Sequence, residues 1–164
     1  MADYGFDGMI KVSFVPTIAD HTAPKLTEVA AGTALEARLT PDGMEITTTT
    51  ANIDTSKLNS TANSATIGRD SFNVSVKYVR GDDTAATAVQ TALTRGASGW
   101  LVVRRDKLAS VPFAAADKVE LYPVICARPN PDKPAANALQ AVAVPMEVTD
   151  GNKVHSVDAQ VALA

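Results

Sequence analysis

The residues that most resemble an acid–base site are two adjacent carboxylates, Asp82 and Asp83, in the turn GDD. Paired carboxylates can divide the general acid and general base roles between them. The same residues also stand where a helical pattern begins, and a carboxylate there accepts hydrogen bonds from free backbone amides and complements the helix dipole. We therefore interpret them as a helix cap, with Gly96 as the left-handed stop at the other end of the helix.

Metal and nucleophile chemistry have few candidates in this chain. It has two histidines, His21 and His155, one cysteine, Cys126, and none of the spacings of a zinc site, a P-loop, a GxSxG elbow or a GxGxxG turn. We interpret the histidines as surface residues and Cys126, which lies in an apolar run, as a buried thiol. The sequence therefore predicts no enzyme, no catalytic, metal-binding or cofactor-binding residues, and no cofactor.

A short basic cluster, Arg104, Arg105 and Lys107, ends one of the predicted strands. Cationic side chains bind phosphate, so a phosphate site is one interpretation of this cluster. The interpretation that we prefer for Arg104 and Arg105 is a subunit contact or a solvated strand end. A net charge of −3 argues against a free nucleic-acid binder, which normally carries a clustered basic surface.

The elements that position these residues are most legible between Ser71 and Lys107. Apolar residues alternate in FNVSVKYV, which indicates a half-buried strand. A helix with one narrow apolar face is expected over about 83–95. The following run, WLVV, does not alternate, which predicts a strand covered on both faces.

This stretch, with the strands on either side of it, resembles the tail tube (major tail) proteins of long, non-contractile-tailed bacteriophages. The matching features are the strand FNVSVKYV, the acidic turn GDD, one Ala/Thr-rich helix ending in RG, and the strand GWLVVRRDK. The similarity covers most of the chain as a pattern of elements. It implies a mainly β fold, a β-sandwich or partial barrel of about eight strands with one α-helix, in copies that form hexameric rings stacked into a tube.

The remainder of the chain is expected to complete a single domain over residues 1–164, beginning with an N-terminal arm at 1–8. A hairpin over 34–51 is predicted around the turn TPDG, in which Gly43 takes a positive φ.

Two further predictions concern the second half of the chain. Pro123 indicates that the strand over 119–127 lies at a sheet edge or contains a bulge. The pair Asp150-Gly151 predicts a second hairpin, whose returning strand runs over 153–161.

Residues 52–70 lack apolar periodicity and are rich in Ser, Thr, Asn and Ala. A structureless segment of this length is usually functional or disordered, so one interpretation is a mobile surface loop without a role. The resemblance favours the other interpretation, because in the tail tube family a long loop at this place contacts the adjacent ring. It implies inter-ring contacts by Asp54, Lys57, Leu58, Ile67 and Arg69.

The resemblance also implies an inner β-barrel through which DNA passes without being bound. A polar wall with little basic charge suits that passage, because each contact that neutralises a phosphate would retard the DNA. The candidate lining residues are Glu36, Glu45, Thr47 and Thr49, with Glu147 as a further acidic candidate.

The partners implied are further copies of the chain, a tape-measure protein inside the tube, and tail terminator and distal tail proteins at its ends. The implied location is the virion tail, with assembly in the host cytoplasm. A contractile-tail tube or a related bacterial injection tube shares the implied fold and remains open at this stage.

A β-sandwich module that binds carbohydrate or protein through its loops is the alternative function. Aromatic residues make up only 5 % of the chain, and Trp100 lies in an apolar run, so an exposed sugar-binding platform is not evident. No apolar run approaches the ~20 residues of a transmembrane helix, and the N-terminal sequence MADYGFDG does not resemble a signal peptide.

Overall fold

The computed structural model describes residues 5–156 and 160–164. Its elements in chain order are β1 (Lys11–Val15), α1 (Leu26–Ala30), β2 (Thr33–Ala34), β3 (Leu39–Asp54), β4 (Ala65–Val79), α2 (Thr84–Ala92), β5 (Ser98–Arg104), β6 (Lys118–Cys126), β7 (Asn130–Pro131), β8 (Ala141–Val148), the 3-10 turn η1 (Gly151–Lys153) and β9 (Val161–Ala162). The expected mainly β fold, with one longer helix, is confirmed.

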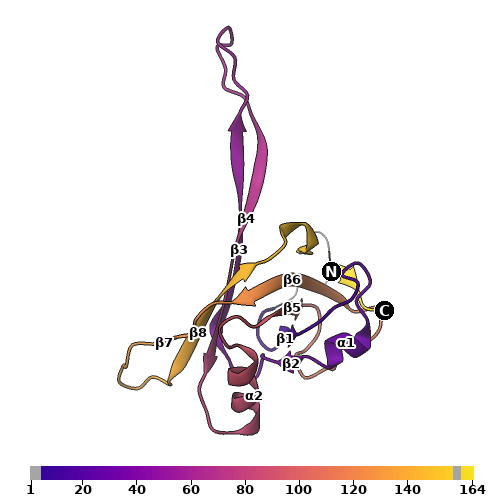
Figure 1. The fold of residues 1–164 in the computed structure, drawn as a ribbon, viewed down its shortest axis with the longest axis vertical. Coiled ribbons are helices and arrows are strands. Elements are labelled where there is room, and N and C mark those ends of the chain that lie inside the picture. The colour runs from indigo at the N-terminus through magenta and orange to yellow at the C-terminus, as the bar shows by residue number, and fades with distance from the viewer. Residues whose placement is uncertain (1–4, 157–159) are drawn as a thin grey trace.

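The strands are antiparallel and form a sheet in the order β2-β1-β5-β6-β8-β4-β3, with β7 added against β8 and β9 against β6. The sheet curls into a partial barrel that does not close, and α2 lies beside it (Figure 1). The β3–β4 hairpin projects far beyond this body. None of the helices in the described ranges is long and apolar enough to cross a membrane.

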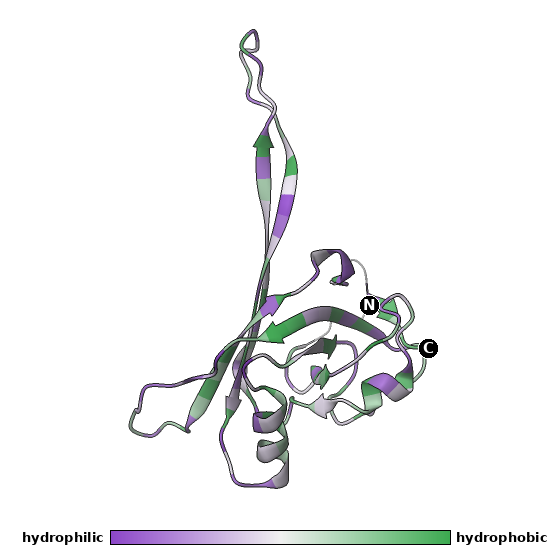
Figure 2. Ribbon diagram, in the orientation of Figure 1, coloured by the Kyte–Doolittle hydropathy of each residue, from purple (hydrophilic) through white to green (hydrophobic). Residues whose placement is uncertain are grey.

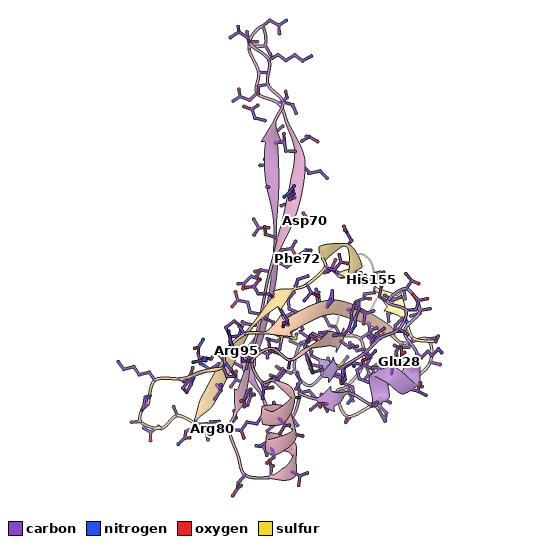
Figure 3. The ribbon with its side chains drawn as sticks, in the orientation of Figure 1. Glu28, Asp70, Phe72, Arg80, Arg95 and His155 are labelled. Atoms are coloured by element: carbon purple, nitrogen blue, oxygen red, sulfur yellow. The ribbon has the colours of Figure 1, made fainter. Side chains whose placement is uncertain are left out.

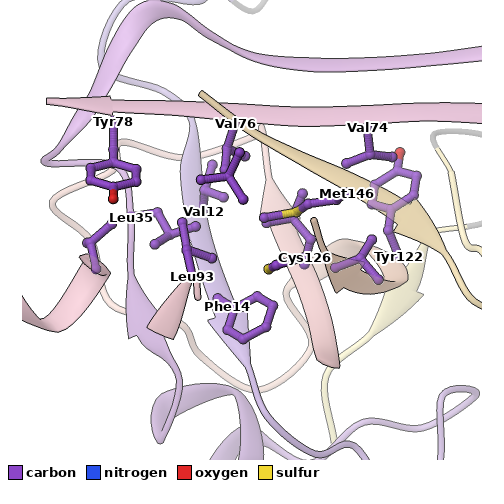
Figure 4. Close-up of a cluster of buried hydrophobic side chains, with 14 of the residues drawn as sticks. Val12, Phe14, Leu35, Val74, Val76, Tyr78, Leu93, Tyr122, Cys126 and Met146 are labelled. Atoms are coloured by element: carbon purple, nitrogen blue, oxygen red, sulfur yellow. The ribbon is translucent and has the colours of Figure 1, made fainter. Parts of the chain in front are cut away.

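The main core lies inside the curl of the sheet. The alternating residues Val74, Val76 and Tyr78 of β4 point into it, because their register partners on β8 belong to the same face (Figure 4). The other buried members of this cluster are Val12, Phe14, Leu35, Val89, Leu93, Leu101, Val103, Tyr122, Val124, Cys126, Val142, Val144 and Met146.

A second, smaller core covers the opposite face of β1, β5 and β6. Leu101 and Val103 enter the main core while Val102, between them, enters the second core. The predicted strand with both faces covered is therefore confirmed. The remaining buried members of the second core are Val15, Ile18, Val29, Val119, Leu121 and Leu163.

The hairpin predicted over 34–51 is wrong. Residues 33–34 pair with β1, whereas β3 begins at Leu39 and pairs with β4 throughout. The segment Thr40–Gly43 is an irregularity between the pairs Leu39–Tyr78 and Met44–Val76, not a turn. Gly43 does not have the predicted positive φ. A Cβ atom at this position would lie 2.5 Å from Lys77 O. The glycine is required by lack of space rather than by its dihedral angle.

The hairpin predicted at Asp150-Gly151 is also wrong. Asp150 accepts a hydrogen bond from the Asn152 amide and caps the turn η1, so the chain does not fold back as a strand. The chain instead crosses to β6, where His155 forms a bridge with Leu121. Residues 157–159 of the predicted returning strand, and residues 1–4 of the predicted N-terminal arm, lie outside the described residues.

Pro123 does not mark an edge strand, because β6 pairs with both β5 and β8. The Pro123 carbonyl accepts a hydrogen bond from the Thr149 amide, 2.9 Å away, just beyond the end of β8. The nitrogen of Pro123, which has no hydrogen to donate, faces the same side as this carbonyl. The ladder between β6 and β8 starts at the next residue, Val124. Proline is tolerated where a ladder ends.

Candidate functional site

The most prominent feature of the molecule is the outer part of the β3–β4 hairpin, residues 48–71, which we call the hairpin arm. Every residue of it except Gly68 is exposed. The predicted loop over 52–70 is wrong in its extent, because β3 reaches Asp54 and β4 begins at Ala65, which leaves a loop of residues 55–64. Apolar alternation could not reveal these strands, since both of their faces meet solvent.

Cross-strand pairing holds the hairpin arm in its extended form. The Thr50 hydroxyl donates to the Asp70 carboxylate across 2.6 Å, and the Thr55 amide donates to Ser64 O across 2.9 Å. The register shifts between the Thr50–Asp70 and Asn52–Ile67 pairs, which marks a β-bulge that includes Gly68. Bulges increase the local twist of a hairpin. Side chains project from both faces of the arm, with Asp70 on it and Phe72 nearer its base (Figure 3).

The structure brings together on this arm all five residues predicted to contact an adjacent ring. Asp54 ends β3, Lys57 and Leu58 lie in the loop, Ile67 pairs with Asn52, and Arg69 lies at the bulge. The Asp54 pKa is lowered by hydrogen bonds from the Ser56 side chain and backbone.

Isolated apolar residues stand among the polar residues of the arm (Figure 2). Leu58 has a relative exposure of 107 %, and Ile67 and the unpredicted Ile53 are exposed by 78 % and 52 %. Aliphatic side chains that are scattered singly over a surface are normal, so these three do not by themselves define an interaction surface.

A second feature is the outer face of the sheet formed by β3, β4 and β8. Met44 and Ile46 pack against the main core, so Glu45, Thr47 and Thr49 alternate onto the opposite, exposed face. Their partners on β4 are Ser75, Asn73 and Ser71. On β3 and β4 this face carries mainly small polar side chains, whereas β8 contributes Ala143, Pro145 and Glu147 to it.

Charges on this face are few. Lys77 forms an ion pair with Asp132 across 2.6 Å, which raises the Lys77 pKa. Glu147 is exposed on β8 and, by register, shares the face with Pro145. Glu36 does not belong to this surface, because it lies after β2 and pairs with Lys11 at 2.8 Å. Glu36, which was predicted to line the lumen together with Glu45, Thr47 and Thr49, therefore lies apart from these three residues.

The third feature is the free edge of β3, which is the last strand in the sheet order. β3 is 16 residues long, whereas the strand at the opposite end of the order, β2, has two residues. Within the described part of the chain, no strand pairs with the outer side of β3. A long uncovered edge presents a row of backbone donors and acceptors to another chain.

Arg104 is not available for a subunit contact or as a solvated strand end. Its side chain is fully buried, and Nη1 donates to Asp117 Oδ2 across 2.8 Å. The guanidinium also donates to three backbone carbonyls at 2.7–3.0 Å, those of Leu108, Val111 and Pro112. Arg104 therefore fastens the segment between β5 and β6 to the body.

Its neighbours in the basic cluster are also paired internally. Arg105 donates to Glu120 across 2.9 Å, and Glu120 is buried beside Tyr122. Lys107 donates to the other oxygen of Asp117. All three cations are engaged by two carboxylates, those of Asp117 and Glu120, and they do not form a phosphate site.

Of the two adjacent carboxylates, Asp82 and Asp83, only Asp83 caps the helix α2. Asp83 is the N-cap of α2, and its Oδ1 accepts a hydrogen bond from the Ala86 amide across 2.8 Å. Asp82 makes no cap bond; it lines an open groove along α2. The helix ends at Ala92, before the expected residue 95, because the turn carrying Gly96 (φ +84°) bonds to Cys126 of β6.

The two histidines, interpreted from sequence as separate surface residues, meet in space. His21 Nδ1 lies 2.8 Å from His155 Nε2, and His21 also stacks on Trp100. In the described ranges, no three His, Cys, Asp or Glu side chains gather as a metal site would require. Cys126 is buried, as predicted, and burial raises the pKa of its thiol to about 11.

Comparison with known proteins gives these features a context. A family model described as phage tail tube protein matches residues 1–161. The fold is similar to that of a chain in the cryo-EM structure of the anti-feeding prophage baseplate, which was six-fold symmetrised; the TM-score is 0.58, the identity 9 %, and the match covers 92 % of this chain and 95 % of that one. A search of curated proteins found no match.

The fold, the open sheet edge and the family match define a structural protein of a phage tail. Because the family model covers almost the whole chain, the protein belongs to the phage tail tube protein family and is a virion component that assembles with other tail components.

Proposed function

We propose that this protein forms hexameric rings that stack into the tail tube of a long, non-contractile phage tail, through which DNA reaches the host. The family match over residues 1–161 supports a tube. The similar fold in a six-fold symmetrised particle supports the ring size. Family resemblance adds a tape-measure protein inside the tube, terminator and distal tail proteins at its ends, and assembly in the host cytoplasm.

The free edge of β3 supports ring closure most directly. A strand of 16 residues with one unpaired side can continue into the sheet of an identical neighbour. A ring requires that this edge meets a different surface of the neighbour, because such heterologous contacts close into a ring when the rotation between neighbours is right.

The polar face suits the inner wall of the tube. Glu45, Thr47 and Thr49 lie on the face opposite the core. Hydroxyl and carboxylate groups offer phosphates no cationic partner, and the cation of this face, Lys77, is matched by Asp132. DNA would pass such a wall without the counterion release that drives binding.

Proline substitution tests the edge contact. Successive amides of an antiparallel strand point to opposite sides, so one of Thr47→Pro and Thr48→Pro removes a bond to β4 and the other removes an amide that faces outward. We expect one variant to lose stability in urea, while the other keeps the wild-type midpoint. Negative-stain images should show rings and tubes for wild type and none for the variant that stays stable.

Tubes formed equally well by the stable proline variant would contradict ring closure through β3. A wild-type protein that stays monomeric at high concentration and with tail-tip components would contradict the tube itself. The alternative of a carbohydrate- or protein-binding module would then be the better account.

Charge placed on the two faces of the hairpin tests the wall. Thr47→Lys adds a cation to the proposed inner face, and Thr48→Lys is the matched control on the opposite face. Tubes of the first variant should retain double-stranded DNA on sedimentation at low salt and release it at high salt. Equal retention by both variants would place the inner wall elsewhere.

A further inference from the structure

A groove runs along the exposed side of α2, at the end of the molecule opposite the tip of the hairpin arm (Figure 1). It has a volume of about 820 Å³. Phe14 and Pro16 contribute from the end of β1, and the small side chains Thr87, Ala88 and Thr91 contribute from the helix. The lining is therefore largely apolar and is open along one side.

The groove has one charged lining residue in the described chain, Asp82. The neighbouring Asp83 is occupied, since it caps α2 and also contacts Arg38. Asp82 makes neither a cap bond nor an ion pair among the described residues. The groove thus combines an apolar floor with a single free negative charge at one end of the helix.

The tip of the hairpin arm, residues 55–64, has the complementary character. Leu58 is fully exposed at 107 % and touches no core. Lys57, next to it, is the only charged residue of the tip. One bare aliphatic side chain and one cation on the tip correspond to one apolar groove and one anion beside α2.

The positions of the tip and the groove decide which molecule can supply the contact. The arm points away from α2 along the longest axis of the molecule, so the tip cannot reach the groove of its own chain (Figure 1). A second copy placed head to tail along that axis brings its tip to this groove. Repetition of such a heterologous contact produces a continuous row of molecules.

We propose that Leu58 of one copy enters the α2 groove of a copy in the adjacent ring, with Lys57 facing Asp82. This inference rests on the proposed stacking of rings and adds to it the receiving surface. Burial of the leucine supplies most of the attraction, and the ion pair sets the register of the tip in the groove.

Cysteine cross-linking tests the contact. Leu58→Cys and Thr87→Cys both replace exposed residues, so the chain should fold normally, and buried Cys126 should stay silent. The matched control joins Leu58→Cys to Thr27→Cys, an exposed threonine on the other helix, α1. After mild oxidation of assembled tubes, non-reducing gels should show a covalent ladder at least about tenfold stronger for the 58/87 pair.

Charge exchange provides a second test. Lys57→Asp and Asp82→Lys should each raise the concentration needed for tube formation by at least about fivefold, because each loses a pair worth ~1 kcal/mol and places two like charges together. The double exchange should restore assembly. Absence of the 58/87 ladder from tubes that do form, together with no rescue by the double exchange, overturns this inference alone.

Two other outcomes also decide the matter. A ladder between Phe6→Cys and Thr87→Cys, with none from Leu58→Cys, would assign the groove to the N-terminal segment and overturn the proposal. If images of the same wild-type samples show neither rings nor tubes, the proposed function fails first and this contact fails with it.

Discussion

The guanidinium of Arg104 lies 2.8 Å from the carboxylate of Asp117, and both side chains are buried. Together with three carbonyl acceptors, this pair fixes the segment between β5 and β6. Without the guanidinium, three backbone carbonyls lose their donor and Asp117 keeps only Lys107 and the Ala114 amide, and breaking a buried pair in this way is strongly destabilising. We therefore predict that Arg104→Met lowers the free energy of unfolding by roughly 3–5 kcal/mol.

Urea unfolding followed by circular dichroism measures this loss. Arg104→Lys should recover little of it, because an ammonium group cannot replace the planar fork that reaches several acceptors. Arg128→Met, at an exposed position, is the control and should stay within about 0.5 kcal/mol of wild type. A stable Arg104→Met variant would mean that the segment is held by other contacts.

Asp117 also makes stability depend on pH. Burial raises its pKa, but hydrogen bonds from Lys107, the Ala114 amide and Arg104 outweigh burial and hold the pKa below the ordinary 3.8. Because the folded pKa is the lower one, the stabilisation is present above the unfolded pKa and is lost as the pH falls through the folded value.

Asp117→Asn removes this titration. We expect the wild-type urea midpoint to fall more steeply than that of the variant between about pH 5 and about pH 2. The variant should be less stable at neutral pH, so the two curves approach each other in acid. Parallel curves would show that Asp117 does not contribute to acid unfolding.

The cap of α2 gives a smaller and more local prediction. Asp83→Ala leaves the Ala86 amide without its acceptor and should cost about 0.5–2 kcal/mol. Asp83→Asn keeps a capping oxygen while removing the charge beside Arg38, so it separates the two contacts. Asp82→Ala is the control in the monomer, and equal losses from both alanine variants in thermal unfolding would contradict the assigned cap.

Gly43 provides a test of packing at the irregularity in β3. A methyl group there would lie 2.5 Å from both Lys77 O and Thr40 Oγ1. Since backbone must move to accept it, Gly43→Ala should destabilise the fold by about 1–3 kcal/mol. Gly5→Ala is the control, because a methyl group there meets no described atom within 4 Å. An unfolding midpoint unchanged by Gly43→Ala would show that the strand yields freely.

The sequence predicts this fold best where one face of an element is buried. Val74, Val76 and Tyr78 alternate with polar residues because β4 covers the main core on one side. Both faces of the outer half of the same strand meet solvent, so its residues show no apolar period and the sequence predicts a loop there. The error lies in the pattern itself, which reports burial and not pairing.

Long-range polar contacts were beyond sequence reasoning for a different reason. Arg104 looked like an exposed cation because its acceptors come mainly from the carbonyls of a segment without regular structure. His21 and His155 are separated by 134 positions, yet their rings lie within hydrogen-bond distance. Such partners meet only in the folded structure, and the local spacing of residues in the sequence does not predict which of them meet.

The hairpin arm yields a last prediction, on proteolysis. Lys57 lies in the exposed loop, whereas Arg69 lies in β4 and its backbone is held near the bulge. Proteases need an extended, unpaired segment, so trypsin should cut free protein after Lys57 well before Arg69. Mass spectrometry of the early fragments measures the order of cutting, and Lys57→Gln should remove the first cut.

Assembly should protect Lys57, because the proposed contact encloses the arm tip in the next ring. Lys153, exposed in the 3-10 turn η1 and not in the arm, is the internal control, and its cutting rate should change little. Cleavage after Lys57 at the same rate in monomer and tube would show that the tip stays in solvent. The arm would then have no role between rings, whatever holds the rings themselves together.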